Sequence, residues 1–148
     1  MADALTNLVS EQARRSPGTL LVETSAGDLI DRITILRIKA ERISNPDKLN
    51  NIRAELAALT RVSATRFPAF DHANGLVADL QRINQAIWDT EDEVRRCEAQ
   101  GEFGDRFIEL ARSIYRTNDR RAAVKQAINQ HLGSRLVEEK QYVEYKLS

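Results

Sequence analysis

Two neighbouring predicted helices carry polar side chains where an apolar pattern would otherwise continue, and these residues are the best suited to chemistry. On the first helix, Asn84, Trp88 and Glu91 share one face. The second helix carries a denser polar run, which comprises Arg112, Tyr115, Arg116, Asn118, Asp119 and Arg120, followed by Arg121 and Lys125. Because polar groups between packed helices must be paired or must meet a ligand, this pattern predicts the position of a site. It does not name a reaction.

Three arginines of the second helix, Arg112, Arg116 and Arg120, follow one another at steps of four residues, so their like charges repel along one face. One interpretation is that Glu91 and Asp92 of the neighbouring helix neutralise this row, while they also pair with Arg95 and Arg96 of their own helix. The other is a pocket for a phosphate or carboxylate, in which the arginines bind the anion as forks. The remaining polar and aromatic residues would then form its hydrogen-bonding partners and its wall: Asn84, Trp88, Tyr115 and Asn118.

A second group of polar residues lies on an earlier helix, where Asp28 and Asp31 are one turn apart. Together with Glu91 or Asp92 they could bind a hard cation such as Mg²⁺, although two acids at this spacing are common. The simpler interpretation pairs Asp28 with Arg32 and with the partial positive charge at the helix start. We therefore predict no metal site and no cofactor, and keep Asp28 and Asp31 as the candidates for Mg²⁺ if there is one.

Several other chemistries find no support in the sequence. His72 and His131 have no cysteine or histidine at metal-ligand spacing, and Cys97 has no base near it in the sequence. The glycine-rich phosphate loops and the strand-to-helix nucleophile elbow are absent as motifs. These devices for nucleotide binding and acyl transfer are therefore set aside.

Composition favours a soluble helical domain with a single core, because the 148 residues are 42% hydrophobic, 30% charged and only 5% aromatic. A net charge of zero gives no general attraction to nucleic acid or to an anionic membrane. No apolar run approaches the roughly 18 residues that span a bilayer. The single cysteine, and a start without the charged and apolar regions of a signal peptide, lead us to expect a cytoplasmic protein.

Helix start and stop signals divide the chain. Ser25 and Asn45-Pro46 predict helix starts, Gly101 an end and Gly133 a final C-cap. Between them, apolar residues recur at steps of three and four, which is the spacing of a heptad seam. On the helix after Ser25, Ile35 and Ile38 widen the apolar surface beyond that seam and predict contact with more than one neighbouring helix.

The predicted fold class is all-α, an antiparallel helical bundle built from two long helical hairpins, plus a short N-terminal helix. The predicted organisation is a short N-terminal helix or arm at 1–18, the bundle at 19–133, and a tail at 134–148 that packs on the bundle or on a partner. In the second hairpin, a turn near residue 102 places Trp88 at the level of Thr117 and Glu91 at the level of Ile114. The residual apolar seams predict a homodimer.

Four stretches of the chain together resemble a bacterial family of short proteins classed only as a domain of unknown function, number 6165 in that series. They are SAGDLIDRITILRIKAERI at 25–43, NQAIWDTED at 84–92, FIELARSIY at 107–115 and NDRRA at 118–122. The resemblance covers about residues 20 to 145. It implies an all-helical protein that is often encoded near glycosyltransferase or cell-surface polysaccharide genes, and it carries no catalytic residues. The chain departs from the pattern at Arg37, where an acid is expected, which weakens the Mg²⁺ hypothesis further.

Three functions of different classes remain open. The first is a small binding or adaptor protein that recognises an anionic ligand, phosphorylated or sugar-linked, or a partner enzyme, in cell-surface glycan assembly. The second is a Mg²⁺-assisted enzyme that acts on a phosphorylated or nucleotide-linked substrate. The third is a structural spacer, in which acidic residues of the helix that carries Glu91 and Asp92 neutralise the arginines of the next helix. We prefer the first, and expect no nucleic acid among its partners.

Overall fold

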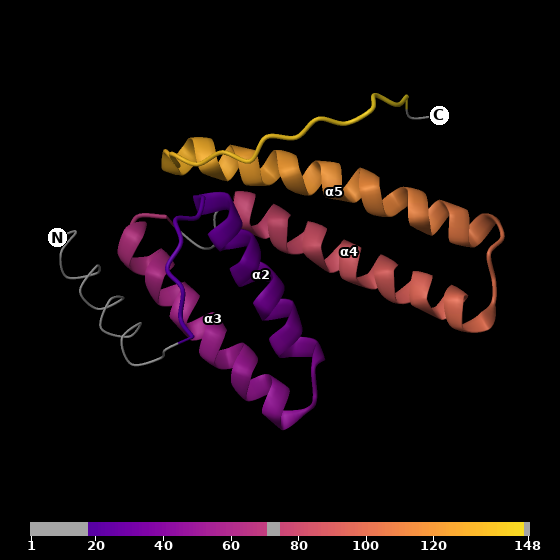
Figure 1. Cartoon of the computed structure of the whole chain (residues 1–148), viewed down its shortest axis with the longest axis horizontal. Helices are drawn as coiled ribbons and strands as arrows, with labels where there is room; N and C mark the ends of the chain where they lie inside the picture. Colours follow the sequence, from indigo (N-terminus) through magenta and orange to yellow (C-terminus); the bar gives the residue numbers. More distant parts are fainter. Residues whose placement is uncertain (1–17, 71–74, 147–148) are drawn as a thin grey trace.

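The protein is all-α in the computed structural model, which describes residues 18–70 and 75–146. Four helices form a bundle in this part of the chain, and it contains no strand: α2 (Ala26–Arg42), α3 (Pro46–Arg66), α4 (Gly75–Gln100) and α5 (Asp105–Leu132). Figure 1 shows their arrangement. The all-α bundle that the sequence predicts is confirmed, whereas the predicted N-terminal helix lies in residues outside the described ranges, apart from Gly18.

Helix ends fall where the sequence predicts them, because each end is defined by local chemistry. Ser25 caps α2, with its Oγ accepting from the Asp28 backbone N–H at 3.1 Å. Asn45 caps α3 in the same way, accepting from the N–H of Lys48 at 3.0 Å, and Pro46 takes the first helical position. Gly133 ends α5 in the left-handed conformation, with a φ of 64°.

The central element is α2, which packs against each of the other three helices, whereas α3 packs against α2 alone among the described helices. Its residues Ile30, Ile33 and Ile38 are at most 1% exposed. The predicted contact of this helix with more than one neighbour is therefore confirmed. A core cluster joins the first half of α2 to Leu80 of α4 and Ile128 of α5, and burial of this apolar surface holds the bundle together.

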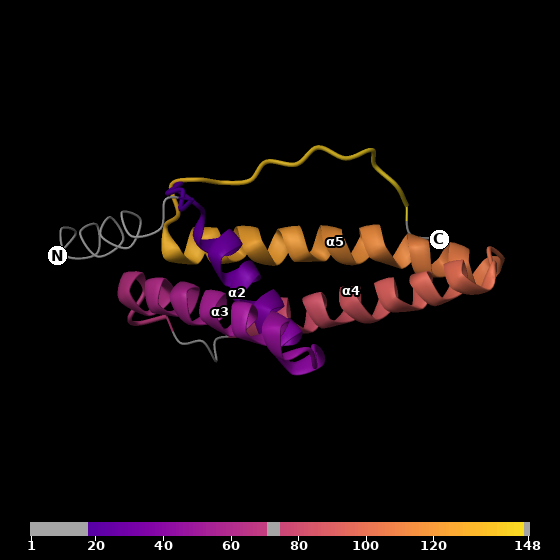
Figure 2. The ribbon, with the colours of Figure 1, turned by 60° about the horizontal axis from the view of Figure 1, so that its bottom comes forward.

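The α4 and α5 helices lie side by side and run in opposite directions, joined by the turn at residues 101–104 (Figures 1 and 2). Within the described ranges, no helix is both long enough and apolar enough to cross a membrane. After Gly133 the chain reverses, and residues 135–146, which we call the tail, run back above α5 without regular secondary structure.

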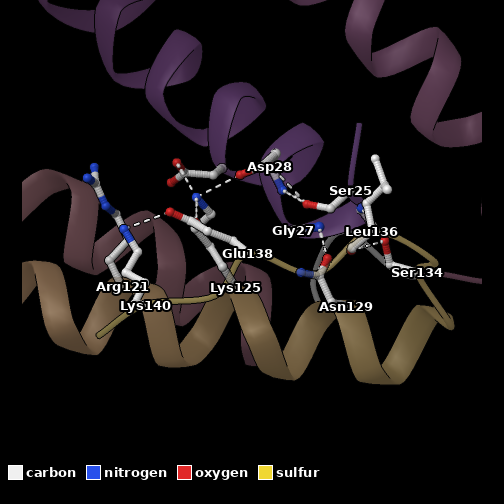
Figure 3. Close-up of polar contacts among 12 residues, drawn as sticks. Ser25, Gly27, Asp28, Arg121, Lys125, Asn129, Ser134, Leu136, Glu138 and Lys140 are labelled. Carbon is white, nitrogen blue, oxygen red and sulfur yellow. Dashed lines mark hydrogen bonds and ion pairs between the residues drawn. The ribbon is translucent and has the colours of Figure 1, made fainter. Parts of the chain in front are cut away.

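The start of α2 rests directly on α5, and glycine is what permits this approach. A Cβ on Gly27 would lie 2.6 Å from the backbone oxygen of Lys125, closer than any side chain could be accommodated. The Gly27 N–H donates to Asn129 Oδ1 at 2.6 Å, and the Ala26 N–H donates to Ser134 Oγ at 3.2 Å (Figure 3). Amides that the helix itself leaves without partners are thus satisfied by α5 and by the residue after its cap.

Candidate functional site

A cleft of about 520 Å³ lies between α5 and the tail. This volume is within the usual range for small-molecule sites. Its walls combine tyrosines, charged groups and one amide, and they are formed by Tyr115, Asn118, Asp119, Arg121, Ala122 and Lys125 of α5 and by Glu138, Lys140, Tyr142, Val143 and Tyr145 of the tail. Figure 2 shows the tail arching over α5 along this stretch.

Lys125 forms one end of the cleft and is fully engaged by acids. Its Nζ lies 2.7 Å from Asp28 Oδ1, 3.1 Å from Glu138 Oε2 and 3.9 Å from Asp31 Oδ2, and its side chain is only 15% exposed (Figure 3). Burial by itself lowers the pKa of Lys125, but the hydrogen bonds and charges of these acids outweigh it and hold the pKa above its ordinary value. The ammonium therefore stays charged and ties α5 to α2 and to the tail.

The carboxylate of Asp28 shows the reciprocal effect. Burial raises its pKa, but the hydrogen bonds from Lys125 and Ser25 and the lysine charge outweigh that cost, so its pKa is lowered. Ser25 Oγ lies 2.9 Å from Asp28 Oδ2. The candidate Mg²⁺ ligands Asp28 and Asp31 thus both face the ammonium of Lys125, which occupies the place that a cation would take. The ion pair expected between Asp28 and Arg32 does not form, because Arg32 turns to Glu55 of α3 and its Nε lies 2.7 Å from Glu55 Oε1.

Behind the cleft, Asn84 of α4 sits in a buried network between three helices. Its Nδ2 donates to Asp31 Oδ1 at 2.7 Å and to Thr34 Oγ1 at 2.9 Å, both on α2. Its Oδ1 accepts from Arg121 Nη1 of α5 at 3.3 Å. The register that puts Trp88 at the level of Thr117 also puts Asn84 at the level of Arg121. Asn84 is only 4% exposed, so it supports the Arg121 side chain from behind and is not itself a cleft residue.

At the other end of the cleft, the tail is held by Tyr145. Its hydroxyl donates to Asp119 Oδ2 at 2.5 Å, and its ring meets Tyr115 edge to face with centroids 5.3 Å apart. The hydrogen bond to Asp119 raises the pKa of Tyr145. The tail is thus attached to α5 at both ends of the cleft, by Glu138 at one and Tyr145 at the other.

The structure brings together part of the predicted site. Tyr115, Asn118 and Asp119 line the cleft, together with Arg121 and Lys125, which the sequence showed in the same polar run. Asn84 contacts the cleft through Arg121. The other predicted site residues are not on the cleft wall: Trp88, Glu91, Arg112, Arg116 and Arg120.

Trp88 has a different neighbour from the one expected. Its ring lies under the guanidinium of Arg42 of α2, whose carbon is 5.7 Å from the ring centroid, and Arg42 also pairs with Asp89 at 2.6 Å. The half-buried indole therefore belongs to the junction of α2 with α4. The α5 arginines, which were expected near it, are not among its partners in the described part of the chain.

The arginine row is not neutralised across the two helices as the simpler interpretation expected. Glu91 and Asp92 lie 3.6 Å and 3.7 Å from Arg95 of their own helix. Arg112 pairs at 2.6 Å with Glu109 of its own helix, and Tyr115 and Glu109 raise its pKa. Arg116 is half-buried with a buried Nε that finds no hydrogen-bond partner among the described residues, and Arg120 is exposed without an ion pair in that part of the chain.

The contribution of the tail was not found from the sequence. Glu138, Lys140, Tyr142 and Tyr145 form a whole wall of the cleft, yet the tail has neither helical nor strand periodicity that would place its side chains. The available signal was the concentration of tyrosines and paired charges after a helix C-cap, which left packing on the bundle and packing on a partner equally open.

Comparison with known proteins gives a family without a function. The model of a family of unknown function (DUF6165) matches residues 20–146, which is most of the chain and includes every element of the cleft. No curated protein and no solved structure shows significant similarity to the chain.

Proposed function

The chain belongs to the family of unknown function DUF6165, and we propose that it is a small binding or adaptor protein whose cleft takes a phosphorylated sugar. The scaffold in this proposal is a bundle of two helical hairpins, of which the second carries the cleft. Cell-surface glycan assembly, which the family resemblance implies, is the process in which such a ligand would be met. The proposal is argued from the side chains of the cleft.

The observation that carries the proposal is the state of Arg121. This half-buried guanidinium lines the cleft, and its one hydrogen bond within the described residues is the 3.3 Å contact with a neutral amide oxygen of Asn84. The other two cations of the cleft are already paired, Lys125 with Asp28 and Lys140 with Glu138 at 2.7 Å. A guanidinium has five donors in a planar fork that fits a phosphate or a carboxylate. Arg121 is thus the cleft cation that can accept an anion without first breaking an ion pair.

The rest of the wall suits a sugar attached to that anion. Asn118 lines the cleft, and its Oδ1 is buried and accepts no hydrogen bond from the described residues, so rotation of this side chain would let a ligand hydroxyl satisfy it. Tyr115, Tyr142 and Tyr145 line the cleft with aromatic rings, which pack against the C–H faces of a sugar. The hydroxyl of Tyr145 already donates to Asp119. The charges of Asp119 and Glu138 disfavour a ligand that is anionic throughout, which is why we propose one phosphate on an otherwise neutral body.

The test is a thermal-shift titration of the full chain with glucose 1-phosphate, glucose and inorganic phosphate. Glucose 1-phosphate at a hundredfold excess over its dissociation constant should raise the melting temperature by about 5 to 10 °C, because it binds only the folded state. Arg121→Ala should abolish the shift, and Arg121→Lys should reduce it, since lysine keeps the charge and loses the fork. Arg120→Ala is the matched control, because Arg120 is the exposed neighbour that does not line the cleft.

Each outcome decides something. A shift with glucose 1-phosphate that exceeds the shifts with phosphate and with glucose supports a site that reads both parts of the ligand. A shift that persists in Arg121→Ala removes Arg121 from the site and overturns the proposal. If neither glucose 1-phosphate nor phosphate shifts the wild type, the proposed binding of a phosphorylated sugar is overturned and the structural spacer becomes the better interpretation.

A further inference from the structure

Most of the tail has no backbone hydrogen bond within the described residues, although the carbonyl of Leu136 accepts from Ser134 Oγ at 2.9 Å. No backbone hydrogen bond joins residues 137–146 to any other described residue. Figure 2 shows this segment arching away from α5 between its two ends, and Val143 and Tyr142 are 91% and 53% exposed. An extended chain with free N–H and C=O groups and exposed β-forming side chains is a template for another strand.

Every second residue of this segment contributes to a pattern of charges. When the same pattern is read in the opposite direction, each negative charge falls opposite a positive one. These residues are Glu138, Lys140, Tyr142, Glu144 and Lys146. When two such segments run antiparallel with Tyr142 opposite Tyr142, every Glu138 faces a Lys146 and every Lys140 faces a Glu144. Residues directly opposite in an antiparallel pair have side chains in contact, so each of these charges meets its opposite.

We propose that a second copy of this chain pairs with the first through the tails, as an antiparallel two-stranded ribbon whose two-fold axis passes between the two Tyr142 residues. Pairing of this kind uses the same patch on both subunits, which is what a closed dimer requires. This order of charges favours a second copy over an unrelated strand, because all of the charges are matched by opposite charges when the segment pairs with another copy of itself.

Two of the four charges that face the partner in this pairing are available, whereas Glu138 is already bound to Lys125 and to Lys140. Glu144 and Lys146 have no ion pair within the described part of the chain, and Lys140 is paired only with Glu138, two residues away. By contrast, the seams of α2 and α4 that the sequence offered as a dimer surface are largely buried inside the subunit, since Leu29, Leu36 and Ile83 are at most 7% exposed. The tail therefore replaces the seams as the proposed interface.

The test exploits the register. Lys140→Glu places glutamate opposite Glu144 twice in each dimer, and Glu144→Lys places lysine opposite Lys140 twice. Each variant alone should raise the dimer dissociation constant about tenfold or more, as measured by sedimentation velocity of the full chain at about 100 μM. The double variant Lys140→Glu with Glu144→Lys restores opposite charges and should dimerise again. A mixture of the two single variants should form a heterodimer, although each is monomeric alone.

Glu139→Lys is the matched control, because it makes the same charge reversal at the adjacent position and faces Tyr145 in the proposed register. It should remain a dimer. Far-ultraviolet circular dichroism of every variant checks that the helices are intact, which exposed tail residues should leave unchanged. The inference is overturned if the wild type is a monomer at this concentration, or if it is a dimer that the single variants leave intact. It does not rest on ligand binding, because the pairing uses the free backbone of the tail and can fail while the cleft still binds.

Discussion

Lys125 of α5 lies 2.7 Å from Asp28 of α2. This ion pair joins two helices through residues that are almost a hundred positions apart in the sequence. The same ammonium reaches Glu138 of the tail at 3.1 Å. One lysine thus holds the start of the central helix, the last helix and one wall of the cleft in a fixed relation (Figure 3).

Replacing this lysine should destabilise the fold. Lys125→Met leaves Asp28 and Asp31 partly buried without their cation, and we expect a loss of about 1 to 3 kcal/mol in the free energy of unfolding, measured by urea denaturation. Lys48→Met, at an exposed position without an ion pair in the described chain, should change it by less than about 0.5 kcal/mol. Equal effects of the two substitutions would show that Lys125 contributes nothing specific.

Acid should remove part of the stability that this ion pair supplies. The pKa of Asp28 in the folded protein is below its ordinary value of 3.8, so its contribution is present above that value and is lost as the pH falls through the folded pKa. Asp28→Asn should therefore be less stable than the wild type at about pH 7, and the difference should shrink toward about pH 3. A difference that stays constant over this interval would contradict the lowered pKa.

Alkali should act on the other partner in the opposite sense. The pKa of Lys125 is above its ordinary value of 10.5, so the stabilisation is complete below that value and is lost as the pH rises through the folded pKa. The wild type should lose stability above about pH 10 more steeply than Lys125→Met, which has no ammonium to titrate. Parallel urea titrations of the two proteins make the comparison, and curves that fall together would exclude a role for this lysine.

Gly27 should tolerate no side chain. In Gly27→Ala, the new Cβ would lie 2.6 Å from a backbone oxygen and 2.9 Å from Asn129 Oδ1, so α2 must move away from α5. We expect a loss of about 1 to 3 kcal/mol in the free energy of unfolding. Gly75→Ala, also in a helix but with nothing within 4 Å of the added Cβ, should be neutral or slightly stabilising. The interpretation fails if the two alanines behave alike.

The fluorescence of Trp88 should respond to changes in α2 and not to ligand binding in the cleft. Its ring contacts Arg42 and does not line the cleft, so saturating glucose 1-phosphate should leave its emission unchanged in the wild type. Arg42→Ala should expose the indole to water and shift its emission to longer wavelength. Arg95→Ala, which replaces an exposed arginine of α4, the helix that carries Trp88, should not. A ligand-dependent change of Trp88 emission would mean that the binding site lies elsewhere or that the bundle rearranges.

The sequence by itself determined the helical class and the helix ends, because caps and apolar spacing act over a few residues. Ser25, Asn45 and Gly133 end or begin helices through hydrogen bonds and backbone angles that neighbouring residues supply. The contact of Asn84 with Arg121 agrees with the register predicted for Trp88 and Thr117, since a short turn leaves little freedom in how far two antiparallel helices are displaced.

Only the tertiary structure decided which polar groups meet. Arg32 of the same helix was the nearest partner in sequence for Asp28, yet Lys125 takes that place, and Arg42 covers Trp88 although the α5 arginines were nearer in the expected hairpin. These choices depend on how each helix is rotated about its own axis, which is set by the close approach at Gly27 and by packing of the whole core. The cleft depends further on a tail without periodicity, whose course is fixed by contacts with α5 and not by its own local preferences.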